Sequence, residues 1–314
     1  MARSHTSNLS PKQLGASSTF TFQSSELPFP TAGRGISEFL ITLTDSDGLT
    51  TRSTGVLNNL SRVRVRAGGA TIVDVSGFQL GEFLTQLAPS DPGIASPAFI
   101  GGAFGLKNAV TFRVPFTVFD DVAEDMQDLS QFPLNKLPTI ELVTNGTMTS
   151  STFASVTTTL TDVTPKWSPK LLGQAMNVPA SANSFRVPIS EAGLIRALGL
   201  GTQSLDIAGS VISMATGFKR YRIVLSNVEK FNGSPLSLFE TTRSFNGYTG
   251  DAPAATTSTF PALTYWKNVG MLPGPAGFSY IEVDSGAYTG TFTNAVYGTP
   301  SAATEWVTWA FDNQ

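Results

Sequence analysis

Apolar and polar residues alternate in several short stretches of the chain, and this period of two is typical of half-buried β-strands. Phe20 and Phe22 are separated by one threonine, and Phe39, Ile41 and Leu43 share one face of a second stretch. Further strand-like stretches lie at residues 110–118, 137–144, 151–163, 205–214, 221–228, 280–283 and 305–311. The pattern therefore predicts a chain built mainly of short strands.

The most regular alternation lies at residues 60–66, where three arginines alternate with two valines. Because successive side chains of a strand point to opposite faces, Arg62, Arg64 and Arg66 fall on one face and the valines on the other. Two glycines then predict a tight turn into a second strand, so we expect this region to form a β-hairpin.

Two interpretations of the arginine row stay open from the sequence. In the first, the guanidinium groups form a solvated or carboxylate-paired face of a sheet, as exposed arginines commonly do. In the second, they contact a neighbouring subunit or a genome, because arginine can bind carboxylate and phosphate groups through two parallel hydrogen bonds. Trp306, in the last predicted strand, lies either in a central strand or at a subunit contact.

Short helices are predicted between some strands. Ser76 is a suitable N-cap for an amphipathic helix that runs to Leu87. Residues 120–129 predict an acidic helix, whose carboxylates either form a cation or catalytic site or lie on a solvated surface. The apolar residues at 194–198 predict a strand-to-helix passage, and Asn145-Gly146 is the strongest short hairpin signal in the chain.

Residues 1–19 are polar, and Arg3, His5 and Lys12 are not balanced there by any acidic residue. We expect a flexible arm, either a frayed terminus or a segment that orders on a neighbouring subunit, a membrane or a genome. Two prolines near residue 167 interrupt the strand pattern and predict a domain boundary. The predicted parts are an arm at 1–19, a first β-domain at 20–166 and a second β-domain at 167–314.

Composition narrows the possible chemistry. The 314 residues include no cysteine and one histidine, which leaves no thiolate nucleophile, no cysteine-bound metal and no Ser-His-Asp triad unless His5 is its base. Only 14% of residues are charged, and 29 glycines and 19 prolines supply many turns, which favours an all-β architecture. The formal net charge of −3 argues against a generally cationic nucleic-acid binder.

Other signals for chemistry are weak. Residues 45–48 resemble the start of a calcium loop, but the later ligands of such a loop are missing, so a plain turn is preferred. No stretch resembles a secretion signal or a membrane span, which predicts a soluble chain. We nominate no catalytic residue, no cofactor and no metal site.

Three motifs together suggest a family. They are the hairpin at Asn59-Leu-Ser-Arg-Val-Arg-Val65 with its Gly-Gly turn, the helix start Ser76-Gly-Phe-Gln-Leu80, and the strand Leu137-Pro-Thr-Ile-Glu-Leu142. In this arrangement the first half resembles the double-jelly-roll major capsid proteins of icosahedral viruses, such as tectivirus-like and corticovirus-like phages. The second half resembles them in length and texture. A tetrapeptide, Phe-Arg-Val-Pro, occurs at 112–115 and 185–188, but its flanks do not match, so we attribute it to chance.

The resemblance implies two eight-stranded jelly rolls side by side, trimers with a pseudo-hexagonal outline, and trimers that tile into a virus shell. The implied partners are other copies of the chain, minor capsid or vertex proteins and an internal membrane, without sequence-specific nucleic-acid binding. The implied location is the virion, after synthesis in the host cytoplasm. Alternatives are a spike or carbohydrate- or receptor-binding protein, and a glycoside hydrolase with two carboxylates. The candidate subunit or inner-face contacts are Arg62, Arg64, Arg66, Trp306, Arg3 and Lys12.

Overall fold

The computed structural model describes residues 3–7, 11–45, 59–77, 79–80, 98–100, 109–116, 131–148, 150–164, 168–178, 183–189, 194–202, 218–225, 227–235, 237–238, 264–271, 279–286 and 291–299. The described residues divide into two compact units, with the boundary between Lys170 and Leu171. The sequence placed this boundary between residues 166 and 167.

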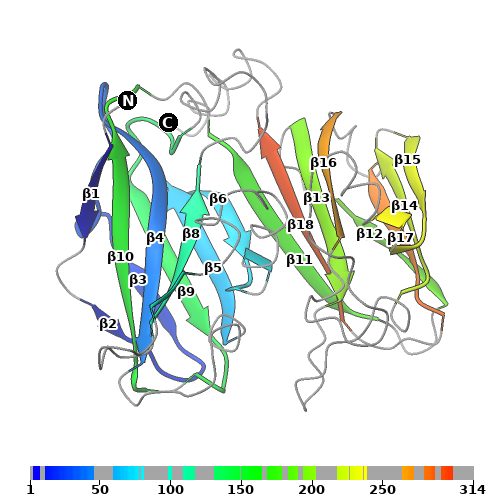
Figure 1. Cartoon of the computed structure of the whole chain (residues 1–314), viewed down its shortest axis with the longest axis horizontal. Helices are drawn as coiled ribbons and strands as arrows, with labels where there is room; N and C mark the ends of the chain where they lie inside the picture. The colour runs from blue at the N-terminus through cyan, green and yellow to red at the C-terminus, as the bar shows by residue number, and fades with distance from the viewer. Residues whose placement is uncertain are drawn as a thin grey trace. The chain divides into compact units, whose positions relative to one another are not determined.

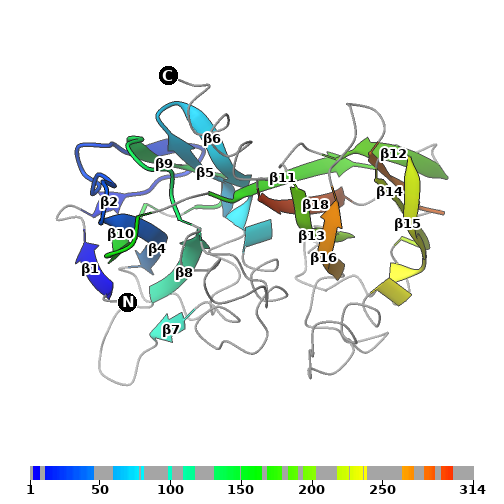
Figure 2. The ribbon, with the colours of Figure 1, turned by 90° about the horizontal axis from the view of Figure 1, so that it is seen from above.

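The first unit is a sandwich of antiparallel sheets (Figures 1 and 2). Its strands are β1 (Arg3–Ser7), β2 (Lys12–Gln13), β3 (Thr19–Phe22), β4 (Gly35–Asp45), β5 (Leu60–Ala67), β6 (Ala70–Val75), β7 (Ala98–Ile100), β8 (Ala109–Pro115), β9 (Pro138–Thr144) and β10 (Thr152–Thr161). One sheet has the strand order β1-β10-β4-β8-β7, with β2 also paired to β10. Four further strands pair in the order β6-β5-β9-β3.

The core of the first unit lies between these sheets. Val63 and Val65 on β5 are buried, as their alternation with arginine predicted. Phe39, Phe116 and Phe132 form an edge-to-face aromatic cluster with ring centroids 5.4–5.9 Å apart. The period-two pattern therefore identifies the buried face of the sheet correctly.

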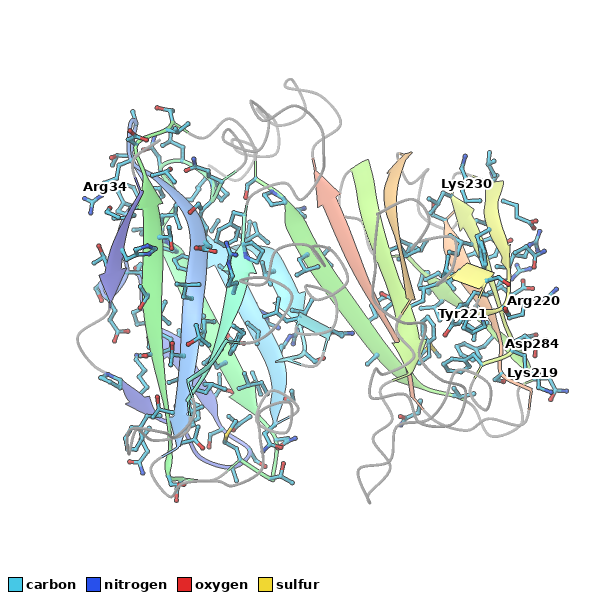
Figure 3. The ribbon with its side chains drawn as sticks, in the orientation of Figure 1. Arg34, Lys219, Arg220, Tyr221, Lys230 and Asp284 are labelled. Atoms are coloured by element: carbon cyan, nitrogen blue, oxygen red, sulfur yellow. The ribbon has the colours of Figure 1, made fainter. Side chains whose placement is uncertain are left out.

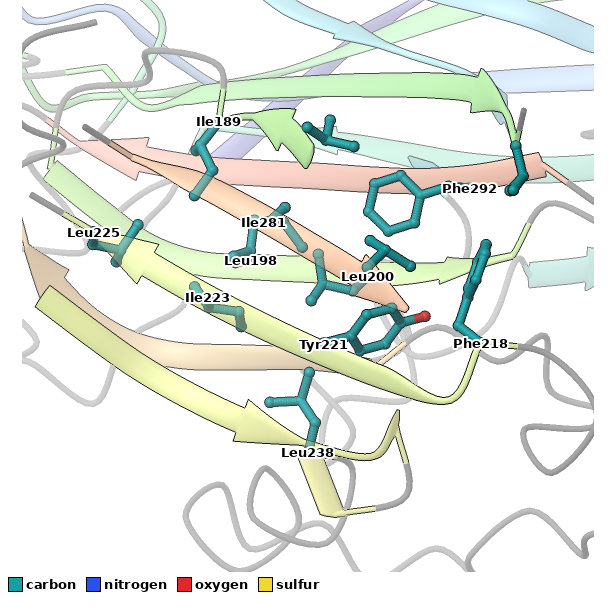
Figure 4. Close-up of a cluster of buried hydrophobic side chains, with 13 residues drawn as sticks. Ile189, Leu198, Leu200, Phe218, Tyr221, Ile223, Leu225, Leu238, Ile281 and Phe292 are labelled. Carbon is teal, nitrogen blue, oxygen red and sulfur yellow. The ribbon is translucent and has the colours of Figure 1, made fainter. Parts of the chain in front are cut away.

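The second unit is also built of antiparallel strands. They are β11 (Lys170–Asn177), β12 (Ser184–Pro188), β13 (Leu194–Thr202), β14 (Arg220–Leu225), β15 (Val228–Gly233), β16 (Thr264–Met271), β17 (Tyr280–Asp284) and β18 (Thr291–Thr299). Their orders are β16-β13-β18-β11 and β12-β17-β14-β15. Buried side chains of both sets meet in one core, which includes Leu200, Tyr221, Ile281 and Phe292 (Figure 4).

The two units have the same strand connectivity. One sheet contains the order β10-β4-β8 in the first unit and β18-β13-β16 in the second. The other has the order β6-β5-β9-β3 in the first unit and β15-β14-β17-β12 in the second. In chain order these two sets correspond strand for strand, and both are jelly rolls. The prediction of an all-β chain with two jelly-roll sandwiches in tandem is confirmed.

A helical turn follows the same hairpin in both units. Ser76 Oγ accepts a hydrogen bond from the backbone N–H of Gln79 (3.1 Å), and Gln79 Oε1 accepts one from the N–H of Ser76 (2.8 Å), which is a reciprocal capping box. In the second unit Ser234 Oγ accepts a hydrogen bond from the N–H of Ser237 (3.1 Å). The predicted N-cap at Ser76 is therefore confirmed, and the predicted helix end at Leu87 lies outside the described residues.

The hairpin predicted at Asn145-Gly146 is wrong. This turn leads from β9 to β10, which belong to different sheets, so it carries the chain across the sandwich. The backbone N–H of Asn145 donates to the carbonyl of Asn59 (2.9 Å), which fixes the turn against a neighbouring loop. An Asn-Gly pair favours a tight turn locally, and tertiary pairing decides which strands that turn joins.

The strand-to-helix passage predicted near residues 194–198 is also wrong, because these residues begin β13. β13 pairs with β16 on one side and with β18 on the other. Gly199 and Gly201 follow within the same strand, and glycine disfavours a helix interior. The two Phe-Arg-Val-Pro segments lie in β8 and β12, which do not correspond between the units.

Residues of the predicted flexible arm form strands in the structure. β1 pairs with β10 over five residues, from Arg3 opposite Thr161 to Ser7 opposite Thr157, and β2 pairs farther along β10. The open edge of a long strand offers backbone hydrogen bonds, and serine and threonine are compatible with an extended backbone. The predicted acidic helix at 120–129 and the strands predicted at 205–214 and 305–311 lie outside the described residues. No helix in the described part of the chain is long and apolar enough to cross a membrane.

Candidate functional site: two arginine ladders

Arg62, Arg64 and Arg66 project from one face of β5, where carboxylates of both neighbouring strands meet them. Arg64 is the register partner of Asp74 on β6 and of Glu141 on β9. Its Nη1 donates to Glu141 Oε1 at 2.8 Å, and its Nε lies 3.5 Å from Asp74 Oδ2. The side chain of this central arginine is only 15% exposed.

The flanking arginines extend this arrangement in both directions. Arg62 forms a bidentate ion pair with Asp74, and this hydrogen bonding raises the pKa of Arg62. Arg66 Nη2 lies 3.7 Å from Glu141 Oε2, beyond hydrogen-bond distance, and the side chain is 40% exposed. We call these five residues, Arg62, Arg64, Arg66, Asp74 and Glu141, the first ladder. The carboxylate-paired interpretation of the arginine row is correct for Arg62 and Arg64.

A second ladder occupies the corresponding sheet of the second unit. We define it as Arg186, Arg220, Arg222, Glu229 and Glu282. Arg186 Nε donates to Glu282 Oε2 at 2.9 Å, and Arg222 Nε donates to Glu229 Oε2 at 2.6 Å. Arg220 Nη2 lies 3.9 Å from Glu282 Oε1. Hydrogen bonding between Arg222 and Glu229 raises the pKa of Arg222 and lowers that of Glu229.

The two ladders have equivalent central pairs, in which an arginine faces a glutamate on the neighbouring strand. Arg64 faces Glu141 across the β5–β9 pair, and Arg222 faces Glu282 across the corresponding β14–β17 pair. The sequence carries this correspondence as Arg-Val-Arg at 62–64 and Arg-Tyr-Arg at 220–222, together with Ile-Glu at 140–141 and 281–282. Sequence reasoning missed the second ladder, although these short repeats could have revealed it.

The remaining predicted contact residues lie elsewhere in the described part or outside it. Lys12 Nζ pairs with Glu26 Oε2 at 2.8 Å, donates to the carbonyl of Thr21 (2.5 Å) and lies 4.9 Å from the centroid of the Phe22 ring. The backbone of Arg3 lies in β1, whereas Trp306 lies outside the described residues. The structure therefore does not bring Lys12 or Arg3 to the first ladder.

His5 does not form a catalytic triad with its described neighbours. Its Nδ1 lies 3.1 Å from Thr159 Oγ1, and that hydroxyl donates to Glu38 Oε1 at 3.0 Å. Glu38 is buried and also forms an ion pair with Arg113 of β8. This polar network connects β1, β10, β4 and β8. Among the described residues no group of three or more histidine or acidic side chains could hold a metal ion.

The sheets and the ladders of the two units define the class of protein by fold. It is a chain of two jelly rolls in tandem, and each jelly roll carries a ladder of charged side chains on the outer face of one sheet. No protein-family model matches the sequence, and no curated protein sequence matches it significantly. Solved structures do match over nearly the whole chain. The resemblance to double-jelly-roll major capsid proteins that the sequence suggested is therefore confirmed for the fold.

Three of these structures are from different viruses. The major capsid protein P2 of bacteriophage PM2 is 11% identical, with a TM-score of 0.62, and the match covers 95% of this chain and 97% of that one. A chain of Sulfolobus turreted icosahedral virus is 12% identical, with a TM-score of 0.63 and coverage of 98% and 96%. A chain of the PBCV-1 virus capsid is 8% identical, with a TM-score of 0.59 and coverage of 95% and 93%.

Proposed function

We propose that this chain is a major capsid protein that self-assembles, as pseudo-hexagonal trimers, into an icosahedral virus shell. The observation that carries the proposal is the likeness of both jelly rolls, in tandem, to the major capsid protein of bacteriophage PM2 over 95% of this chain and 97% of that one. Composition supports it, because a charged fraction of 14% suits surfaces that other subunits cover. No catalytic role and no cofactor are part of the proposal.

The proposed partners are other copies of the chain, first within a trimer and then in neighbouring trimers. Minor capsid or vertex proteins and an internal membrane are further proposed partners, without sequence-specific nucleic-acid binding. The proposed location is the virion, after synthesis in the host cytoplasm. Within this proposal the exposed ends of the first ladder, Arg62 and Arg66, contribute to subunit contacts, as do Arg3, Lys12 and Trp306.

The alternative of a spike or carbohydrate-binding protein is less favoured, because the likeness to the capsid structures extends over both units. Native mass measurement of the purified chain, followed by electron microscopy, tests the proposal. We expect trimers, and shells or sheets of trimers at higher protein concentration. A chain that stays monomeric at every protein and salt concentration would contradict the proposal, and specific binding on a glycan array by that monomer would favour the alternative.

A further inference from the structure

Arg186 of the second ladder is held in place while most of its surface is exposed. Its Nε donates to Glu282, and its Cζ lies 4.6 Å from the centroid of the Tyr280 ring. Even so, 62% of the side chain is exposed. A guanidinium fixed from two sides loses little rotamer freedom when it binds a partner, and arginine and tyrosine are enriched at the centres of protein interfaces.

Comparison of the two units separates what the jelly roll requires from what is particular to the second unit. A facing arginine–glutamate pair occurs in both units, as Arg64–Glu141 in the first and as Arg222–Glu282 in the second. At the positions of Arg186 and Tyr280, the first unit has Thr21 and Thr139. The fold therefore does not depend on an arginine stacked on a tyrosine at this place.

The outer face of the β12-β17-β14-β15 sheet and its rim also carry more cations than carboxylates. Arg220 and Lys219, labelled in Figure 3, are exposed next to each other at the start of β14, and Lys230 lies on β15. The cations are Arg186, Lys219, Arg220, Arg222 and Lys230, and the carboxylates are Glu229, Glu282 and Asp284. Arg220 Nη2 lies 3.9 Å from Glu282 Oε1, the nearest described carboxylate oxygen, which is beyond hydrogen-bond distance. The N–H groups of Arg220 can therefore donate to a closer carboxylate of a partner.

We propose that this face of the second unit receives carboxylates of a second copy of the chain, with Arg186 as its main donor. The inference rests on the proposed function, since it names a contact by which the chain would assemble. A second copy can supply negative charge to this cationic face, because the chain has 23 acidic and 20 basic residues. Residues 120–128 alone contain five acidic residues and no basic residue. A contact between two different faces of one chain can close into a ring.

The test compares Arg186→Glu with Arg34→Glu, which makes the same charge change at an exposed turn of the first unit (Figure 3). Native mass measurement over a protein concentration series reports the midpoint of association. We expect Arg34→Glu to assemble as the parent chain does, and Arg186→Glu to need at least about tenfold more protein. Arg186→Lys, which keeps the charge but loses the fork and the stacking, should fall between them.

The possible results distinguish a failure of the inference from a failure of the proposed function. If the parent chain assembles and Arg186→Glu assembles at the same concentration, the inference is overturned and the proposed function stands. If the parent chain itself never assembles, the proposed function fails and the inference falls with it. Equal losses in Arg186→Glu and Arg34→Glu also overturn the inference, as does Arg186-dependent binding to anionic vesicles or nucleic acid with assembly unchanged. Should Arg186→Glu fail to fold, Tyr280→Leu removes the stack alone and must weaken association by about threefold.

Discussion

Glu141 and Glu282 occupy the same position in the two jelly rolls, each opposite the central arginine of the neighbouring strand. Both carboxylate side chains are 18% exposed. The recurrence of this ion pair at corresponding positions of the two units indicates that it belongs to the sandwich itself. It fixes the register of the central strand pair, because a slip of one residue would turn the arginine into the core.

The first prediction concerns this ion pair. Glu141→Gln should lower the free energy of unfolding by about 1–3 kcal/mol, because it leaves the mostly buried Arg64 without its hydrogen-bonded charge partner. Urea unfolding followed by tryptophan fluorescence or circular dichroism measures the change. Asp162→Asn, at an exposed position, is the matched control and should change stability by less than about 0.5 kcal/mol. Equal effects of the two substitutions would show that the pair does not contribute.

Part of the fold could be read from the sequence because local pattern determines it. The alternation at residues 60–66 identified the hairpin, the face that bears the arginines and the buried Val63 and Val65. The Ser76 cap was predictable because a serine followed by glutamine three residues later has a local hydrogen-bonding logic. The turns at Gly68 and Gly69 were also predictable, and their φ angles of 56° and 100° suit glycine.

Other features could not be predicted, because they depend on pairings between distant parts of the chain. The sequence near Asn145 does not indicate that the next strand, β10, joins the opposite sheet. The identity of the carboxylate that faces each arginine depends on register, which joins Arg64 to a residue 77 positions away. The short repeats could have revealed Arg220, Arg222 and Glu282 of the second ladder, but not Arg186, because only the pairing of β12 with β17 brings that residue to Glu282.

A second prediction concerns the close approach of the chain at Gly35. A Cβ added there would lie 1.6 Å from Gln131 Oε1 and 2.7 Å from the backbone carbonyl oxygen of Val163. Gln131 is buried and accepts a hydrogen bond from Thr161, and the Val163 carbonyl belongs to the backbone. Neither neighbour can move without cost, so Gly35→Ala should destabilise the first unit by about 1–3 kcal/mol. Gly15→Ala, whose Cβ would have its nearest neighbour at 3.9 Å, is the control. Thermal unfolding of both variants checks this, and equal melting temperatures would contradict it.

A third prediction compares the two helix caps. Ser76→Ala removes one half of a buried capping box and should reduce stability by about 1–2 kcal/mol. Ser234→Ala removes a cap that is more exposed and lacks the reciprocal glutamine, so its effect should be about 0.5–1 kcal/mol. Urea unfolding measures both, with Ser→Thr at each position as the conservative control. A larger loss at Ser234 would show that burial and reciprocity of the cap do not determine its contribution.

The last prediction is a pH dependence at the start of the first unit. The hydrogen bond from Lys12 lowers the pKa of Glu26 below its ordinary value of 4.5, and the backbone N–H of Gln23 adds to the effect. Because the folded chain then binds this proton less tightly than the unfolded chain, the pair stabilises the fold above the unfolded pKa and is lost as pH falls through the folded pKa. Glu26→Gln should therefore lower the free energy of unfolding near neutral pH, by less than about 1 kcal/mol because the pair is partly exposed. In urea unfolding the difference from the parent chain should shrink between about pH 5 and about pH 3, whereas a constant difference would rule out an ionic contribution.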